Sequence, residues 1–193
     1  MKKSIPQLLK QNTVEDYIRA AEETARWIQA QEVREKTGKT WKIFPQGQDG
    51  LEGSVFLGKR TFYAGVAGIG FFFLRLYQLT AKGEWLSEAK AAADYLLANP
   101  LGIEYYRAVQ KKIADNAEGV HGWAFSYKVG PISAAQFAYG LYKVTGDERY
   151  RDFALEQADT FVAAAIEDEK GIHWSDCRDI VGDAGGIVYL LQV

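Results

Sequence analysis

The stretch "GVAGIGFFFLRLYQLTAKGEWLSEAKAAADYL" (Gly65 to Leu96) decides the fold, because the chain contains a second copy of it. At an offset of 65 residues it aligns without a gap with "GPISAAQFAYGLYKVTGDERYRDFALEQADTF" (Gly130 to Phe161). Eight of the 32 aligned positions are identical, among them the leading glycine, a Leu-Tyr pair and a threonine. Self-similarity at a fixed period is typical of folds that are assembled from repeated units.

Each copy predicts a pair of helices. The first helix, about 68–79, is apolar almost all round, which indicates burial on every side. A short polar break follows, and the second helix, about 84–97, is amphipathic, with Trp85, Ala89, Ala92 and Leu96 on one face. The second copy predicts the same pair over about 133–144 and 147–166.

An earlier amphipathic helix is predicted from the capping box "TVED" (Thr13 to Asp16) to about Gln31, with Tyr17, Ala21, Thr24 and Ile28 on one side. Two connectors rich in glycine and aromatic residues, 36–61 and 101–128, separate the helices, with short strands expected around "WKIF" or "SVFL". We therefore expect an all-α protein.

A buried helix paired with an amphipathic one suggests two concentric layers, as in an α/α toroid, with the buried helices forming the inner ring. The glycine turns at Gly65, Gly68 and Gly130 would then meet at one end of the ring, where helix starts present free N–H groups and form a pocket. The alternative is that these glycines merely permit tight turns and close approach.

Composition excludes several classes. The 193 residues fit one domain, with 48% hydrophobic residues, and Lys+Arg 23 against Asp+Glu 25 gives a net charge of −2, which does not favour nucleic-acid binding. The apolar run "GIGFFFL" is too short to span a membrane, and the N-terminus lacks the apolar stretch of a signal peptide. The single cysteine, Cys177, excludes an internal disulfide. We expect a cytoplasmic protein.

The last residues predict a third unit. "GDAGGIVYLL" (Gly182 to Leu191) aligns with "GVAGIGFFFL" (Gly65 to Leu74), so the chain would end inside a third inner helix. We expect one partial toroid domain over 1–193 with units at about 62–100, 127–167 and 179–193. An open ring edge would expose apolar surface and favour self-association.

These residues resemble the lanthionine synthetase C-like family, whose α/α barrel has a repeated Gly-x-x-Gly turn opening each inner helix. "FYAGVAGIGFFFLRLYQLTAKGEWLSEA" is similar to the family's early repeat and "KVGPISAAQFAYGLYKVTGDERYRDFA" to the next. "GIHWSDCRDIVGDAGGIVYLL" resembles the third, in which an aspartate precedes the turn. The resemblance covers the chain from about Phe62 onward.

The resemblance implies a cyclase that adds a cysteine thiol of a peptide across a dehydroalanine or dehydrobutyrine to form a thioether. The partners it implies are a dehydrated precursor peptide, made by a dehydratase, or glutathione as in eukaryotic relatives. A zinc ion would hold the thiolate. In the family the zinc ligands come from later repeats, so none is expected in this chain, which alone would be inactive.

One residue of the family's chemistry matches a position in this sequence. By resemblance Asp179 would be the acid/base, with Asp183 or Asp176 as alternatives, and Gly182 would belong to the same turn. Asp179 could equally cap its helix. His121 is read as a structural or pocket-lining residue, and His173 and Cys177, four residues apart in an expected irregular connector, as packing or surface residues rather than zinc ligands.

Two other functions stay open at this point. The first is an α/α-barrel carbohydrate enzyme, with carboxylates such as Glu104, Asp115, Asp176 and Asp179 along its cleft. The second is a non-catalytic helical scaffold that binds peptides. The sequence does not specify the substrate peptide.

Overall fold

The computed structural model describes residues 13–42, 59–63, 65–116, 123–169, 171–174 and 186, and this part of the chain is mostly helical, as predicted. Its helices are α2 (Val14–Gln29), α4 (Val66–Thr80), α5 (Gly83–Ala98), α6 (Ile103–Asn116), α7 (Pro131–Thr145) and α8 (Glu148–Ala163), with a short 3-10 turn η1 (Trp123–Phe125). Two antiparallel hairpins accompany them, β1 (Glu32–Arg34) with β2 (Lys39–Trp41) and β3 (Ile166–Asp168) with β4 (Gly171–His173).

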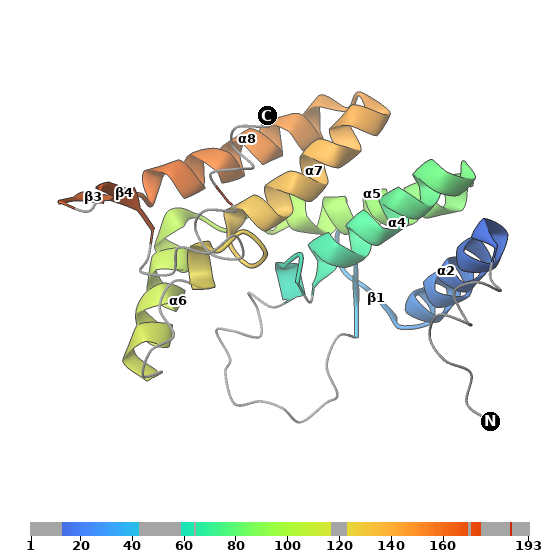
Figure 1. The fold of residues 1–193 in the computed structure, drawn as a ribbon, viewed down its shortest axis with the longest axis horizontal. Helices are drawn as coiled ribbons and strands as arrows, with labels where there is room; N and C mark the ends of the chain where they lie inside the picture. The colour runs from blue at the N-terminus through green and yellow to red at the C-terminus, as the bar shows by residue number, and fades with distance from the viewer. Residues whose placement is uncertain are drawn as a thin grey trace.

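The two predicted helical pairs form the hairpins α4–α5 and α7–α8. Their bounds differ by 65 residues at all four helices, as a comparison of 66–80 with 131–145 and of 83–98 with 148–163 shows. The helices α4 and α7 lie side by side and run in the same direction, each followed by its own partner helix (Figure 1). The predicted inner face of α5 is correct, since Trp85, Ala89, Ala92 and Leu96 are all fully buried.

Both inner helices end in the same way. Thr80 Oγ1 donates to the carbonyl of Leu76, and the equivalent Thr145 Oγ1 donates to that of Leu141, at 2.7 and 2.8 Å. The next residue then turns into the left-handed region, with φ 55° at Ala81 and 70° at Gly146. This C-cap reverses the chain within two residues, so the partner helix packs back on its own inner helix.

The helix α2 packs against the first hairpin and forms ion pairs with it. Its predicted capping box at Thr13 and Asp16 is present. Arg26 is bonded to Glu84 of α5 at 2.8 and 2.9 Å, while Lys39 of β2 reaches the nearly buried Glu88 at 2.9 Å. The predicted face was partly wrong, because Tyr17 and Thr24 are exposed and the helix packs around the buried Ala25.

The segment 101–128 also differs from its expected form. It contains the helix α6 where a connector was expected, because Ile103, Tyr106 and Val109 recur every third residue and give one packing face, on which Tyr106 and Val109 are buried. In the segment 36–61 the strand β2 ends at Trp41, and "SVFL" lies outside the described residues. The helix α8 ends at Ala163, and Ile166 begins the strand β3 instead of ending the helix.

Among the described residues, no helix combines the length and the apolarity that a membrane crossing requires.

Candidate functional site: a groove between α4 and α7

The starts of α4 and α7 are joined by hydrogen bonds. The backbone N–H groups of Phe62 and Tyr63, just before α4, donate to the carbonyl of Lys128, just before α7, at 3.1 and 3.2 Å. The N–H of Phe62 also lies 3.3 Å from Ser133 Oγ, which accepts from it inside α7. The two glycine turns therefore meet at one end of the helical pair, as predicted.

The glycines of these turns do not offer the free N–H groups that we expected. Gly65 and Gly68 both donate to the carbonyl of Thr61, and Gly130 donates to that of Ser126. A Cβ at Gly68 would lie 2.2 Å from the carbonyl oxygen of Phe62. Close approach of two backbone segments thus explains Gly68, and a pocket-lining role for these glycines stays a prediction.

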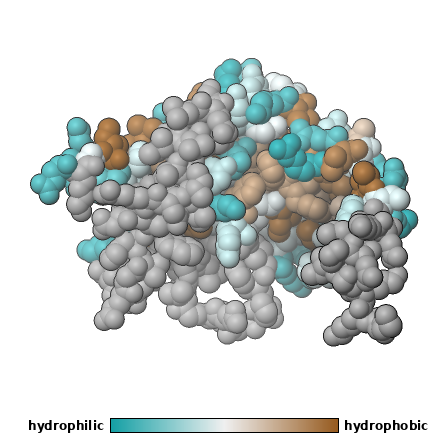
Figure 2. All heavy atoms as spheres, in the orientation of Figure 1, coloured by the Kyte–Doolittle hydropathy of each residue, from teal (hydrophilic) through white to brown (hydrophobic). Residues whose placement is uncertain are grey.

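A groove of about 370 Å³ runs between α4 and α7 beyond the turns. The positions that line it are equivalent in the two repeats: Phe71 corresponds to Gln136, Leu74 to Tyr139, Arg75 to Gly140 and Gln78 to Lys143, with Val144 beyond them. Each helix therefore turns the same face toward one shared space. Figure 2 shows hydrophilic groups between these helices, beside a more hydrophobic surface.

Two cations lie on aromatic rings at the walls of the groove. The guanidinium of Arg75 lies 4.9 Å from the ring centroid of Phe71, and the Lys143 ammonium lies 4.7 Å from that of Tyr139. Arg75 also donates to Gln78 Oε1 at 2.9 Å. Within the described residues neither cation forms an ion pair, and no acidic side chain lines the groove. The site is locally positive in a chain of net charge −2.

Two further features of α7 shape the groove. Gly140 removes a side chain at its centre; a Cβ there would meet Leu74 at 3.4 Å and Phe71 at 3.9 Å, which are ordinary contacts. Gln136 Oε1 is buried and accepts no hydrogen bond from the described residues. Burial raises the pKa of the neighbouring Tyr127, while a hydrogen bond with Gln136 lowers it by a smaller amount. The groove therefore combines open space with an acceptor that lacks a donor.

A pocket of similar size, about 380 Å³, lies between the β1–β2 connection and the end of α5. Its lining mixes Glu35 with Lys36, Lys59 and the end of α5 at Asn99. Nearby, Arg60 is buried, and its Nη2 donates to the carbonyl of Leu96 at 3.2 Å while Nε and Nη1 have no partner among the described residues. Burial lowers the pKa of Arg60. This arginine satisfies a terminal carbonyl of α5, which is a structural role.

Most of the site residues predicted from the sequence lie outside the described residues. Asp176, Asp179, Gly182, Asp183 and His121 belong to this group, as does Cys177. Of the carboxylates considered for a carbohydrate enzyme, Glu104 is exposed on α6 and pairs with Arg107 at 3.2 Å. The side chain of Asp115 is not described.

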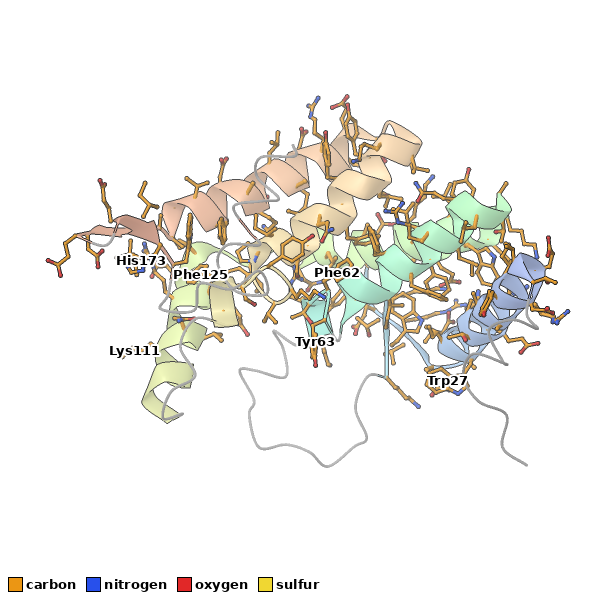
Figure 3. All side chains as sticks on the ribbon, viewed as in Figure 1. Trp27, Phe62, Tyr63, Lys111, Phe125 and His173 are labelled. Atoms are coloured by element: carbon orange, nitrogen blue, oxygen red, sulfur yellow. The ribbon has the colours of Figure 1, made fainter. Side chains whose placement is uncertain are left out.

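Zinc does not fit the part of the chain that the structure describes. No group of three or more His, Cys, Asp or Glu side chains comes together there in a metal-binding arrangement. His173 lies at the end of the strand β4 (Figure 3), rather than in an irregular connector. Its Nε2 is 3.2 Å from Asp168 Oδ2. We therefore assign no step of a reaction to a metal on these residues.

The groove residues were not singled out from the sequence, although a signal was present. Both inner helices, 30 residues in all, lack aspartate and glutamate, yet each carries a cation and a glutamine in an otherwise apolar run. Arg75 and Gln78 are three residues apart, and Gln136 and Lys143 are seven apart, so each pair lies on one helix face. A polar face inside a buried helix predicts a lumen or a ligand.

Comparison with known proteins gave no family assignment: no protein-family model matches the chain, and neither does any curated protein.

Proposed function

We propose that this chain forms part of an α/α toroid of the lanthionine synthetase C-like type, and that the groove between α4 and α7 binds a peptide in its lumen. One observation carries the proposal: equivalent positions of two repeated helices line the same groove. In a ring of repeated hairpins each inner helix presents the same face to the centre. Gly186 adds support, because it is helical and buried, and a Cβ on it would lie 2.4 Å from the Phe161 ring of α8.

The lining suits a peptide better than a sugar. The aromatic and aliphatic side chains of Phe71, Leu74 and Val144 offer apolar contacts, while Gln78 and Gln136 offer amide groups that match a peptide backbone. Glycoside hydrolysis needs paired carboxylates, and the described lining contains none. A peptide ligand is therefore favoured over an oligosaccharide.

The reaction that the resemblance suggests is addition of a thiol to a dehydroamino acid. The sulfur would bond to the β-carbon, and the resulting enolate would take a proton at the α-carbon. In this proposal Asp179, or Asp183 or Asp176 in its place, handles these protons. The thiol would come from a cysteine of the same peptide or from glutathione, and a zinc ion that activates it would need ligands other than the described residues.

A second candidate function is a peptide-binding scaffold without catalysis. It is favoured by the described lining of the groove, which provides cations, amides and rings but no thiol or carboxylate that could act as nucleophile or base. Both candidates share the peptide, so peptide binding is the property to test first.

The groove can be blocked without disturbing the backbone. In Gly140→Leu, the Cβ makes ordinary contacts and the remaining carbons enter the groove. Gly83→Leu is a matched control, because a Cβ at Gly83 meets nothing within 4 Å. Binding of labelled peptides, measured by fluorescence anisotropy, should be lost in Gly140→Leu and kept in Gly83→Leu. Binding of oligosaccharides but not of peptides would contradict the proposal.

Two further measurements separate the candidates. Mass spectrometry of a dehydroalanine peptide incubated with a thiol, with and without the protein, measures the reaction. Adduct formation faster than the protein-free reaction would indicate the cyclase-like function and contradict the expectation that this chain alone is inactive, and Asp179→Asn should remove any such increase. Elemental analysis of the purified chain should show no stoichiometric zinc, and one zinc per chain would contradict our assignment of the metal to other residues.

Self-association of the chain also stays a prediction. The residues Leu155 and Val162 of α8 and Ile172 of β4 are more than half exposed, at 53%, 54% and 65%. Apolar side chains at this end would favour contact between copies. Analytical ultracentrifugation over a range of concentrations measures it, and a strict monomer would weaken the open-ring interpretation.

A further inference from the structure

We propose that the occupant of the groove is an acidic peptide, and that Arg75 and Lys143 together bind a carboxylate next to an apolar residue of that peptide. This inference rests on the proposed function, because it names the class of peptide that the same groove selects. It is carried by the charges, the contacts of the two cations and the shape of the groove.

The two cations of the groove lack a carboxylate partner among the described residues. Six of the eight described arginines form ion pairs with carboxylates, but the only side-chain partners described for Arg75 are the amide oxygen of Gln78 and the ring of Phe71. Neither α4 nor α7 contains an aspartate or a glutamate, whereas α5 and α8 carry several. Among the described residues no acidic side chain lines this face, so the two cations can attract an anion.

The position of Arg75 brings its head group toward Lys143. Lys143 is equivalent to Gln78 in the repeat, and the guanidinium of Arg75 is bonded to that same Gln78. The Arg75 head group therefore reaches toward the level of Lys143 on the opposite wall. A cation stacked on a ring keeps N–H groups that can donate to a carboxylate, and such charge-assisted bonds are stronger than neutral ones.

The shape sets the neighbouring residue. Gly140 opens the groove beside Leu74 and Phe71, which provides apolar contact next to the cations. A volume of about 370 Å³ is at the small end of ligand sites, so a few residues of a peptide fill it. The exposed carboxamide of Gln78 can donate a hydrogen bond to a backbone carbonyl of that peptide.

The test uses two labelled octapeptides that differ in charge alone. One has a central Leu-Phe pair flanked by glutamates, and the other has glutamines in their place. We expect the glutamate peptide to bind about tenfold more tightly at low salt, and the advantage to shrink as NaCl rises from about 0.05 M to about 0.5 M.

Charge variants locate the effect. Arg75→Gln and Lys143→Gln should each weaken binding of the glutamate peptide about threefold, and the double variant should bind both peptides equally. Lys90→Gln, on the exposed side of α5, removes the same charge away from the groove and should leave the preference unchanged. Circular dichroism shows whether each variant is folded.

The outcomes distinguish the two proposals. If Gly140→Leu abolishes binding of both peptides but the protein does not prefer the glutamate peptide, the groove binds peptides and the inference about acidity is wrong. If the preference survives the double variant, or if Gly140→Leu does not affect it, the acidic peptide binds elsewhere and the inference is again wrong. If neither peptide binds, the proposed function fails with it.

Discussion

The hairpins α4–α5 and α7–α8 begin and end at equivalent positions of the repeat, but different residues occupy several of these positions. At the first buried position of the outer helix the first hairpin uses Trp85 and the second uses Tyr150. At the third position of the inner helix the first hairpin has Gly68 and the second has Ser133. In the groove, Arg75 of the first hairpin corresponds to Gly140 of the second. The backbone is repeated, while packing, polarity and charge are divided between the two copies.

This difference shows which features the architecture requires and which belong to one copy. The C-caps, the Thr80 and Thr145 hydrogen bonds and the buried outer-helix aromatic occur in both hairpins. By contrast, Arg75 on α4 corresponds to the open position Gly140 on α7, and the buried Gln157 on α8 corresponds to Ala92 on α5. We expect substitutions at shared features to affect folding and substitutions at unshared ones to affect the groove or fine stability.

The largest effect is expected at the shared aromatic position. Trp85 is fully buried and stacks on Phe73 with ring centroids 5.9 Å apart, and Tyr150 is 1% exposed. Trp85→Ala should lower the free energy of unfolding by about 4 kcal/mol and Tyr150→Ala by about 3 kcal/mol, because each leaves a cavity. Urea unfolding followed by circular dichroism measures both. A loss below about 1 kcal/mol in either variant would contradict an equal role for the two hairpins.

A reciprocal exchange tests the glycine turn. Gly68→Ser should cost about 3 kcal/mol, because its Cβ would lie 2.2 Å from the backbone oxygen of Phe62. Ser133→Gly should cost about 1 kcal/mol, through a lost hydrogen bond to Phe62 and a glycine inside a helix. Thermal and urea unfolding give both values, and equal costs would show that the two turns are interchangeable.

The outer helix of the second hairpin has a buried amide side chain that the first hairpin lacks. Gln157 is fully buried, and neither polar atom of its carboxamide has a hydrogen-bond partner within the described structure; the equivalent residue of α5 is Ala92. Gln157→Met should raise the free energy of unfolding by about 2 kcal/mol, because it removes an unpaired polar group at similar volume. Glu156→Met, on the exposed side, is the control and should be nearly neutral. Destabilisation by Gln157→Met would indicate a bonded partner.

The smallest expected effect is a dependence of stability on pH that arises from the second hairpin. Burial raises the pKa of Tyr150 from 10.0 to about 12, with the Asp94 carboxylate adding to it, whereas Trp85 does not ionise. Because the folded pKa is the higher one, the stability from Tyr150 is present below pH 10 and is lost as pH rises through about 12. A rise of the pKa from 10.0 to about 12 corresponds to at most about 2.7 kcal/mol, and we expect a loss of about 1 kcal/mol because the ionised phenol can turn toward water.

Urea titrations between these pH values, with tyrosinate absorbance as a second readout, measure that loss. Tyr150→Phe should reduce the alkaline decrease and Trp85→Phe should not. An unchanged decrease in Tyr150→Phe would place the titration elsewhere, such as Tyr106, whose pKa burial also raises to about 12.

The helical hairpins could be predicted from the sequence because their signals are local. The spacing of Trp85, Ala89, Ala92 and Leu96 is the helix period itself, and all four are buried. The helix α6 was missed because Gly102 and neighbouring aromatics resembled a connector, although Tyr106 and Val109 share one face. For α2 the period was right and the face partly right: Ala21 and Ile28 pack against the core, whereas Tyr17 and Thr24 are exposed and Ala25 is buried instead.

The groove could not be predicted in the same way, because it depends on which helices pair. On one helix Arg75 is an ordinary exposed residue, and Lys143 is another. They belong to one site only because α4 and α7 lie side by side. The acid/base assignment of Asp179 came from the resemblance and stays a prediction, since this residue lies outside the described part of the chain.

The hydrogen bonds from Phe62 and Tyr63 to Lys128 also have a mechanical consequence. They tie α4 and α7 at their starting ends, while in the described structure no hydrogen bond joins the far ends at Thr80 and Thr145. Backbone bonds therefore fix the starting ends of the two helices relative to each other, whereas side-chain packing sets their separation at Arg75 and Lys143. A larger side chain between them would widen the groove without breaking a backbone hydrogen bond between the helices.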